Sequence, residues 1–403
     1  MAQPDAIAGN APAPEPPPEL AERLWPSREQ RLLLEAALLH GERSLCAYRE
    51  WRAGTNLDAE FSWSVLRLLP AVYEKLRAAG HDDRLMGRLK GVYRRAWYES
   101  NQLFHRVRPV VQGLAERGVP VLVLKGAALL LAYYRQHGLR PMADIDLWVS
   151  ESSLPVALQV LRDQGWRFGI EPDTDHIRFH HAVQCFGPDG GELDLHWHVF
   201  WERGRRAVDE AALARSEPID FLGIPLRQLD PTTLLLHVVT HGVRWNRETP
   251  IRWIPDSLTI LRQRGADVDW TLFTRLTREM HSARRTSMGL AYLAGRFGAP
   301  IPGHVIRTLA DTRLTLLERI DNSVLLRSED AFAHSALRQQ WAAFADYCRR
   351  TDATNPLAFA VGYTHYLRYR WRLGGRREIP GRIWRGIRRR LPGSPPGTHL
   401  DPA

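Results

Sequence analysis

Cysteine is scarce in this sequence of 403 residues, and long apolar runs are missing from it. Its three cysteines, Cys46, Cys185 and Cys348, are too few and too widely spaced for a disulfide framework or a cysteine-based zinc site. The N-terminus is acidic and proline-rich, without the basic and apolar segments of a secretory signal. No apolar run reaches the roughly 18 residues that a membrane-spanning helix needs. These absences predict a cytoplasmic protein without a transmembrane segment.

Lysine is as rare as cysteine. It occurs at Lys75, Lys90 and Lys125, so that 52 of the 55 basic residues are arginine. Lys125 interrupts the apolar segment VLVLKGAALLLAYY, residues 121–134, at the end of what the pattern predicts to be a buried strand. Because the composition strongly favours arginine, composition does not account for a lysine at this point.

The net charge of +10 belongs almost entirely to one end of the chain. Between Arg368 and Arg390 there are ten arginines and one acidic residue, Glu378, which together contribute +9. The segment 366–403 contains tryptophan among these arginines. Such a composition suits contact with nucleic acid or with an anionic surface such as lipid. It equally suits a solvated basic helix, and both alternatives stay open.

The periodicity of apolar residues predicts an α+β protein, with a small mixed-sheet module inserted between N-terminal and C-terminal helical regions. The predicted segments are a disordered Pro/Ala-rich N-terminus (1–25), a helical region (26–116), the α/β core (117–228), a second helical region (229–365) and the basic tail (366–403). Within the core we expect strands at 119–124 and 142–149, helices at 126–138 and 152–166, and a hairpin of strands at 180–186 and 192–200. Gly138 is the expected end of the first helix.

Two carboxylates stand two residues apart in the predicted strand ADIDLWV. Side chains at positions i and i+2 of a strand leave the same face, so Asp144 and Asp146 point together. The alternate residues of this strand are expected to face the core: Ala143, Ile145, Leu147 and Val149. The strand thus combines an apolar face with an acidic one.

The predicted strand ELDLHWHVF repeats this arrangement. Its polar face carries Glu192, Asp194, His196 and His198, and its apolar face carries Leu193, Leu195, Trp197 and Val199. If the two strands are neighbours in the sheet, Asp144, Asp146 and Asp194 converge on one patch. We expect Trp197 to pack in the core.

Like charges that cluster in this way are costly unless a cation neutralises them. Mg²⁺ is typically held by one or two carboxylates together with substrate phosphates. Two such ions can stabilise the entering and leaving oxygens of a phosphoryl or nucleotidyl displacement. The alternative is that the D-x-D pair lies on the solvated face of a half-exposed sheet. The matching acidic face on a second strand favours the metal site.

The stretch VPVLVLKGAALLLAYYRQHGLRPMADIDLWV, followed by ELDLHWHVF, resembles the uncharacterised bacterial nucleotidyltransferase family of the DNA polymerase beta superfamily. The resemblance extends over roughly residues 28–270. It implies a nucleotidyltransferase fold that binds an NTP and Mg²⁺, with two ions expected and Mn²⁺ as the alternative ion. It also implies that Asp144, Asp146 and Asp194 are the catalytic, metal-binding carboxylates.

The sequence departs from the broader superfamily at two adjacent positions. Relatives there usually have Gly-Ser at the start of the helix after the first strand, and this chain has Lys125-Gly126. Backbone N–H groups at a helix start can hold phosphate, and a lysine adds a point charge. Alternatively, Lys125 extends from the strand end to solvent.

Further polar residues fall in the predicted helices that follow the core. His237 and His241 are spaced to share one helix face, with Trp245 one turn later. They can bind zinc, line a nucleotide cleft or pack between helices. Arg252 and Asp256, with a tryptophan beside the arginine, can contact a base or an acceptor, or can hold helices together.

The favoured hypothesis is an enzyme that moves a nucleoside monophosphate from an NTP to an unidentified hydroxyl or phosphate acceptor, with Asp194 accepting the acceptor's proton. The residues expected at the nucleotide are Lys125, Gly126, Arg140, His196, His241 and Arg252. The alternative is a catalytically inactive module of the same fold that binds a nucleotide, a nucleic acid or a partner.

Overall fold

The computed structural model describes residues 25–55, 60–201, 206–243, 251–315 and 355–388, together with 318, 319, 344, 347, 348 and 351. The chain divides into two compact units. The first comprises Met1–Pro172 and His181–Leu314, and the second comprises Asp173–His180 and Thr315–Ala403. The predicted disordered N-terminus, except its last residue, and the end of the basic tail beyond 388 lie outside the described residues.

The first unit begins with the predicted helices. They are α2 (Arg28–Leu38), α3 (Glu42–Ala53), α4 (Trp63–Leu66), α5 (Leu69–Ala78) and the 31-residue α6 (Met86–Glu116). The Ser27 hydroxyl accepts a hydrogen bond from the Gln30 backbone, and the Gln30 side chain accepts one from the Ser27 backbone. This capping box explains where α2 starts.

Seven strands form one mixed sheet in the order β3-β4-β5-β2-β1-β7-β6. Their bounds are β1 (Val121–Val123), β2 (Ile145–Val149), β3 (Arg167–Phe168), β4 (Ala182–Phe186), β5 (Glu192–His196), β6 (Glu217–Phe221) and β7 (Ile224–Gln228). β2 pairs in parallel with β5 and antiparallel with β1, whereas β4 and β5 form the predicted antiparallel hairpin. The α+β mixed-sheet fold predicted from the sequence is therefore confirmed. Strands β3, β6 and β7 were not among the predicted ones.

Two local predictions in this region are wrong. The helix after β1 runs as α7 (Lys125–Leu129) and the π-helix η1 (Leu130–Tyr134), and it ends where Arg135 takes a left-handed φ of 57°. It therefore stops before Gly138. Glycine is required at that position for a different reason, because a Cβ there would overlap the ring of Tyr93. Ala143 is exposed, since β2 starts only at Ile145.

The remaining helices of the first unit follow the strands. They are η2 (Glu151–Ser153), α8 (Leu154–Asp163), α10 (Arg206–Arg215), α11 (Pro231–Gly242), α12 (Trp253–Arg264), η3 (Gly265–Asp267), α13 (Trp270–Glu279), α14 (Ala283–Phe297) and α15 (Gly303–Ala310). Asp230 caps α11 through hydrogen bonds from the Thr232 and Thr233 backbones, and Pro231 occupies the first turn.

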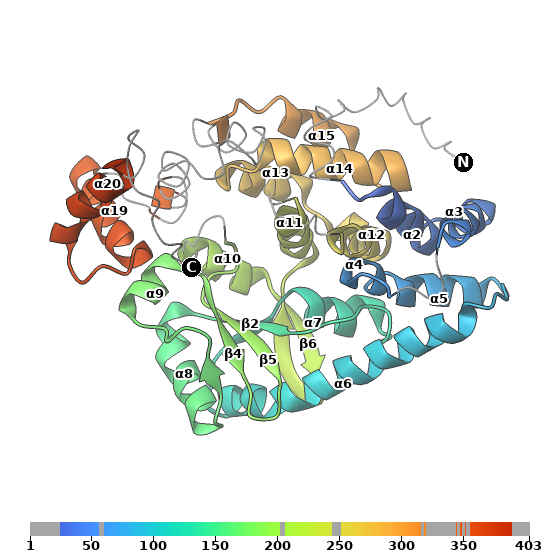
Figure 1. Ribbon diagram of the computed structural model, residues 1–403, viewed down its shortest axis with the longest axis horizontal. Helices are drawn as coiled ribbons and strands as arrows, with labels where there is room; N and C mark the ends of the chain where they lie inside the picture. Colours follow the sequence, from blue (N-terminus) through green and yellow to red (C-terminus); the bar gives the residue numbers. More distant parts are fainter. Residues whose placement is uncertain are drawn as a thin grey trace. The chain divides into compact units, whose positions relative to one another are not determined.

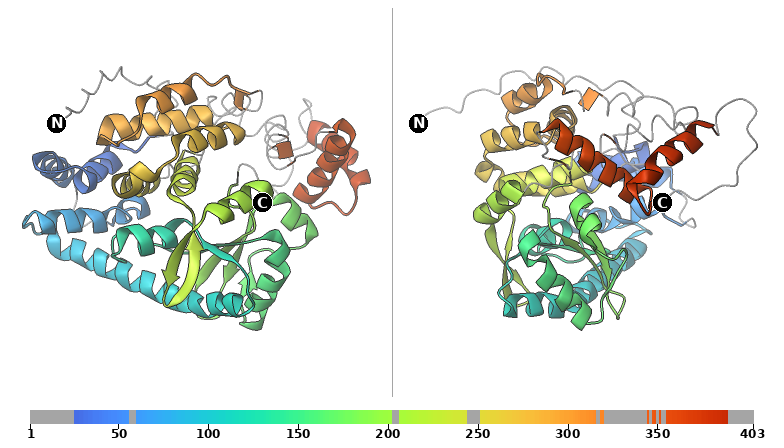
Figure 2. Two further views of the ribbon diagram at one scale, coloured as in Figure 1. Left: turned by 180° about the vertical axis from the view of Figure 1, so that it is seen from behind. Right: turned by 90° about the vertical axis from the view of Figure 1, so that its left-hand side faces the viewer.

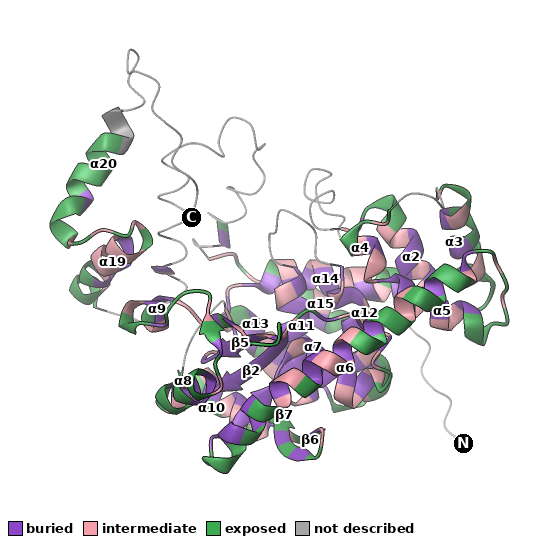
Figure 3. Cartoon of the chain, turned by 60° about the horizontal axis from the view of Figure 1, so that its bottom comes forward, coloured by how far each residue is buried: buried purple, intermediate pink, exposed green. Residues whose placement is uncertain are grey.

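The long helix α6 packs along one face of the sheet, and α7 packs against β2 with α11 beyond it (Figure 1). Figure 2 shows the same relation from two other sides, with α6 drawn in cyan beside the strands. Helix α6 has exposed residues on its outer side and buried residues on its inner side, whereas β2 is buried throughout (Figure 3). One apolar core joins α2–α5 to α11–α15 and to sheet residues such as Leu122 and Trp148. The helical regions before and after the module therefore share its core.

The second unit contains α9 (Thr174–Phe179), α19 (Pro356–Arg370), η4 (Arg376–Glu378) and α20 (Ile379–Arg388). An ion pair between Asp175 and Arg368 ties α9 to α19, and the His176 Nδ1 lies 3.0 Å from the Tyr369 hydroxyl. The predicted boundary at 365/366 falls inside α19. None of the helices in the described part of the chain combines the length and the apolar character needed to cross a membrane.

Candidate functional site

The predicted carboxylates come together because β2 and β5 are neighbours. Asp146 and Asp194 are direct register partners in this parallel pair, so their side chains leave the same face of the sheet side by side. Asp144 lies two residues before Asp146, just ahead of β2. All three line one cavity of about 380 Å³. The convergence expected from the alternation of residues in two strands is therefore present.

This face of the sheet is not a solvated surface. The exposed fraction of Asp146 is 4%, and Trp148 further along the same strand is buried. The prediction that Trp197 belongs to the core is confirmed, since its exposed fraction is 1%. A half-exposed acidic sheet therefore does not explain the D-x-D pair.

Asp146 lies between two basic side chains. Lys125 Nζ donates a hydrogen bond to Asp146 Oδ1, and His196 Nε2 lies 3.0 Å from the same oxygen. Burial by itself would raise the pKa of Asp146, but the charge of Lys125 and the hydrogen bond with His196 hold that pKa well below its usual range. The pKa of His196 is lowered by burial and then by Lys125. Asp146 is therefore the carboxylate whose charge the protein itself stabilises.

The other two carboxylates lack this support. Burial, followed by the charges of Asp146 and Asp144, raises the pKa of Asp194 to about 7. Burial and Asp146 also raise the pKa of Asp144. The positive charge near Asp144 and Asp194 thus does not offset burial and the repulsion among the carboxylates, and the cluster favours binding a cation.

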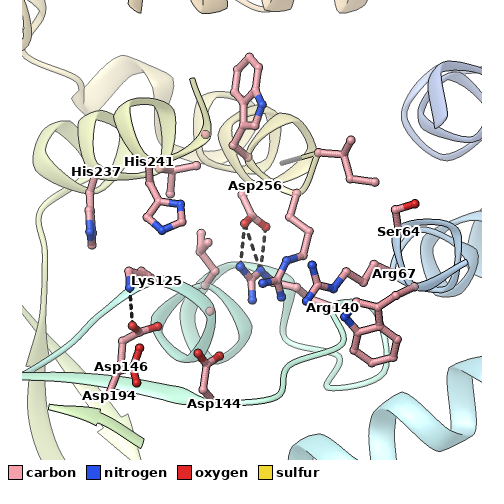
Figure 4. A pocket seen from close by; sticks show the side chains of 18 residues that line it. Ser64, Arg67, Lys125, Arg140, Asp144, Asp146, Asp194, His237, His241 and Asp256 are labelled. Carbon is pink, nitrogen blue, oxygen red and sulfur yellow. Dashed lines mark hydrogen bonds and ion pairs between the residues drawn. The ribbon is translucent and has the colours of Figure 1, made fainter. Parts of the chain in front are cut away.

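The donor set can be compared with the needs of a metal ion. Ligand atoms of Asp146, Asp194 and His196 all lie within 4.8 Å of one another, and no other group of three such side chains occurs in the described part of the chain. Carboxylate oxygens suit Mg²⁺ and Mn²⁺, and an imidazole nitrogen suits Mn²⁺ better than Mg²⁺. The residues fit a divalent cation. Asp144 is not in this group, but it faces the same cavity (Figure 4).

Lys125 reaches Asp146 from an unusual backbone conformation. It begins α7 with a φ of 42°, in the left-handed region that favours glycine. In this chain a lysine occupies the position, and its ammonium group is hydrogen-bonded to the carboxylate of Asp146.

Gly126 is needed because side chains of the next loop lie against it. A Cβ added there would overlap Arg140 Nη1 and would come within 2.9 Å of Met142 Sδ. Arg140 cannot move aside, because its guanidinium makes three hydrogen bonds of 2.9–3.1 Å to Asp256 of α12. The hydroxyl of Tyr134 also donates to Asp256, at 2.9 Å. Arg140 and Asp256 thus tie the core module to the helices that follow it.

The opposite wall of the cavity is basic. Arg67, which directly follows α4, lines it together with Arg140 and Arg252, and Figure 4 shows the first two on the side away from Asp146 and Asp194. Arg252 Nη1 donates to the Pro141 carbonyl at 3.0 Å. Burial, and then the charges of Arg140 and Arg67, lower the pKa of Arg252 to about 10. The cavity therefore has an acidic side and a basic side.

The histidines of α11 complete the cavity. His237 and His241 line it, and both project from α11 in Figure 4. Neither belongs to the group of potential metal ligands formed by Asp146, Asp194 and His196. The third member of their predicted helix face, Trp245, lies outside the described residues.

The residues predicted to contact a nucleotide are distributed unevenly. Lys125, Gly126, Arg140, His241 and Arg252 line the cavity. His196 does not line it, because it is buried against Asp146. Sequence reasoning did not anticipate the contributions of Trp63, Ser64 and Arg67, and in a chain with 52 arginines the sequence holds no signal that singles out Arg67.

With this geometry in place, the chain can be compared with known proteins. A profile described as "uncharacterised nucleotidyltransferase" matches residues 64–298, more than half of the chain. The chain belongs to this family. The match spans every residue of the cavity described above, from Ser64 to Asp256, except Trp63. A search of curated proteins found no match to the chain.

Three solved structures are similar to parts of this chain at 15% sequence identity. A solution structure of the antibiotic-resistance factor ANT(2'')-Ia covers 50% of this chain and 95% of its own, with a TM-score of 0.32. A crystal structure of ANT(2")-Ia in complex with adenylyl-2"-tobramycin covers 49% and 99%, with a TM-score of 0.30. A crystal structure of an antigenic nucleotidyltransferase-like protein from Paracoccidioides brasiliensis covers 54% and 96%, with a TM-score of 0.33. At these scores the identification depends on the family match.

Proposed function

We propose that the protein is a divalent-metal-dependent nucleotidyltransferase that moves a nucleoside monophosphate from an NTP to a hydroxyl or phosphate acceptor. The observation that carries the proposal is the pairing of Asp146 and Asp194 on adjacent parallel strands, inside a cavity whose other wall is basic. A metal-bound NTP would match both walls of this cavity. Its cation would face the carboxylates, and its negatively charged triphosphate would face the basic side chains.

Asp146, Asp194 and His196 would hold the metal, with Asp144 beside them; the ion would neutralise charge on the phosphate oxygens. Since His196 does not line the cavity, it would act on the nucleotide only through the metal and through Asp146, whose carboxylate it orients. Mg²⁺ is the ion we expect first, with Mn²⁺ as the alternative, and two ions are expected from the family resemblance.

In the proposed reaction the acceptor oxygen attacks the α-phosphorus of the NTP. The bond from that phosphorus to the oxygen bridging to the β-phosphate breaks, and pyrophosphate leaves with the electron pair. Asp194 accepts the proton of an acceptor hydroxyl. Lys125, Arg140 and Arg252 offset the charge of the triphosphate, and the small Gly126 lets the start of α7 approach it.

The test separates nucleotidyl transfer from phosphoryl transfer. Purified protein, Mg²⁺ and extract of the source organism are incubated with each NTP labelled either at the α- or at the γ-phosphate. We expect label from the α-position, and not from the γ-position, in an acceptor-sized product, with one NTP preferred. The reaction should stop with EDTA.

Matched variants complete this experiment. Asp146→Asn removes one carboxylate charge from the cluster and should reduce transfer by about 100-fold or more. Asp82→Asn makes the same change at an exposed position outside the cavity and should leave transfer unchanged. Equal activity of wild type and Asp146→Asn, or the absence of both saturable NTP binding and α-label transfer, would overturn the proposal.

One observation favours a second candidate, a nucleotide-binding module without catalysis. The ammonium group of Lys125 is hydrogen-bonded to the carboxylate that would hold the metal. If that contact persists with nucleotide bound, the protein would bind an NTP with little dependence on Mg²⁺ and would transfer no α-label. Calorimetric titration of NTP with Mg²⁺ and with EDTA distinguishes the two candidates.

The basic tail is a separate part of the proposal. In its described portion the side chain of Trp384 is 61% exposed, and Ile383 beside it is exposed too. Exposed tryptophan among arginines supports contact with a nucleic acid or an anionic surface. Arg382→Glu combined with Arg385→Glu should then weaken binding to both heparin and anionic vesicles, and unchanged retention would contradict this role.

A further inference from the structure

A second cavity, of about 340 Å³, lies on the other side of the arginine wall. It is lined mainly by residues of α2, α5, η1 and α12, which come from both helical regions and from the core. Arg67, Arg140, Arg252 and Asp256 line this cavity as well as the first one. None of the three aspartates at the proposed metal site lines it. A ligand bound here would thus be separated from the carboxylate cluster by the arginines.

Most of the lining is apolar. The apolar residues are Leu34, Ala37 and Leu38 of α2, Leu68 before α5, Ala71 and Ala78 of α5, Tyr133 and Tyr134 of η1, Leu139, and Pro255 of α12. A cavity of a few hundred Å³ with mainly apolar walls and a few polar groups is the usual form of a small-molecule site. Its walls therefore suit a ligand with an apolar body.

The polar groups of this cavity are mainly cations. Lys75 and Arg262 join the three shared arginines, and the acidic side chains are Glu74 and Asp256. Both acids already have partners: Asp256 is hydrogen-bonded to Arg140, and Glu74 binds Arg77, which does not line the cavity, through both of its oxygens.

Three of the other cations have no such partner. In the described part of the chain no acidic side chain forms an ion pair with Lys75, Arg252 or Arg262. Lys75 Nζ instead lies 3.0 Å from His40 Nδ1, and Arg262 Nη2 donates to the Leu38 carbonyl at 3.0 Å.

The ionisation of these groups is consistent with a surplus of positive charge. Burial, and then Arg262, lowers the pKa of Lys75. The charge of Lys75, followed by burial and Arg262, lowers the pKa of His40. A bound anion would relieve this repulsion, as it would relieve that between Arg252 and its neighbouring arginines.

We propose that this second cavity binds a small organic anion, with an apolar body against the leucines and alanines and a carboxylate near Lys75 and the arginines. Lys75 is one of three lysines in the chain, and it provides the point charge, whereas the arginines offer planar donors. The site is distinct from the carboxylate cluster and does not depend on the proposed nucleotidyl transfer.

The test uses octanoate as the probe and calorimetric titration of the full chain. Wild type should bind octanoate saturably at one site, and should bind acetate and 1-octanol at least tenfold more weakly, because each lacks one half of the recognised group. Octanol binding as tight as octanoate binding would overturn the proposal, as would the absence of saturable octanoate binding.

Variants then locate the site. Lys75→Gln removes the charge and should weaken octanoate binding about tenfold or more. Lys90→Gln makes the same change at an exposed lysine of α6 and should bind like wild type. Ala71→Phe fills the cavity and should abolish binding. If circular dichroism shows that this variant is unfolded, the result for Lys75→Gln tests the location of the site. Asp146→Asn should leave octanoate binding unchanged, and loss of binding in that variant, or wild-type binding by Lys75→Gln, would place the ligand elsewhere and overturn the proposal.

Discussion

Lys125 and Asp146 are in contact across the cavity floor, with the lysine ammonium on the carboxylate oxygen that also faces His196. The contact joins the start of α7 to β2, and the backbone of the lysine is in the left-handed region. A residue that is unfavourable for its local conformation thus supplies a charge to the proposed metal site. Strain of this kind persists when the surrounding structure maintains it and is found often at functional sites.

Lys125→Gly and Lys125→Met separate the charge from the strain. Both remove the ammonium group, and we expect both to weaken NTP binding about tenfold or more, the loss of one charge-assisted hydrogen bond. Only glycine relieves the left-handed backbone, so Lys125→Gly should be more stable to urea than Lys125→Met by about 1 kcal/mol. Equal free energies of unfolding for the two variants would contradict the strain, and wild-type NTP affinity would contradict the role of the charge.

The raised pKa of Asp194 makes the stability of the metal-free protein depend on pH. A carboxyl whose pKa is about 7 in the folded state and near 4 when unfolded stabilises the fold below pH 4 and loses that contribution as the pH rises toward 7. Relative to wild type, Asp194→Asn should therefore become more stable between pH 5 and pH 8. With allowance for solvent around this half-buried group, we expect about 1–3 kcal/mol.

Thermal unfolding in EDTA at several pH values measures this difference. Mg²⁺ should remove most of it, because the cation favours the ionised carboxyl. A stability difference between wild type and Asp194→Asn that stays constant from pH 5 to pH 8 in EDTA would show that the pKa of Asp194 is not raised.

Gly126 should not tolerate even one added carbon. In Gly126→Ala the new Cβ meets Arg140, which Asp256 holds in place, so we expect destabilisation of about 1–3 kcal/mol together with weaker NTP binding. Gly91→Ala is the matched control: it lies in α6 with no atom within 4 Å of its added Cβ, and should stabilise the protein by about 0.5–1 kcal/mol. Urea denaturation of both variants shows whether the signs are opposite.

The buried pair Arg140–Asp256 should matter far more than an exposed pair. Asp256→Asn leaves the guanidinium of Arg140 beside Arg252 without its counter-charge, and we expect a loss of about 3–5 kcal/mol in the free energy of unfolding. Glu50→Gln breaks the exposed pair with Arg28 and should cost less than about 1 kcal/mol. Similar losses in the two variants, measured by urea denaturation, would show that Arg140 and Asp256 do not hold the cavity together.

Much of the acidic side of the cavity could be predicted from the sequence, because it depends on local periodicity. Residues two apart in a strand share a face, so ADIDLWV and ELDLHWHVF suffice to place Asp144, Asp146 and Asp194 on polar faces. The bounds of α7 were not predictable in the same way. Its end depends on Arg135 adopting a left-handed conformation, and Gly138 has a packing role that no helix pattern reveals.

The sequence by itself determined the α+β class, the order of helical and sheet regions and the chemistry of the carboxylates. All of these follow from spacings of two to four residues along one chain segment. Only the tertiary structure decided that β2 and β5 are parallel neighbours, that Lys125 contacts Asp146, and that Asp256 anchors Arg140 from 116 residues away. It also decided where Lys75 and Arg262 meet beside an apolar cavity. Such contacts depend on which helices and strands pack against one another, and the periodicity within one segment does not specify its partner.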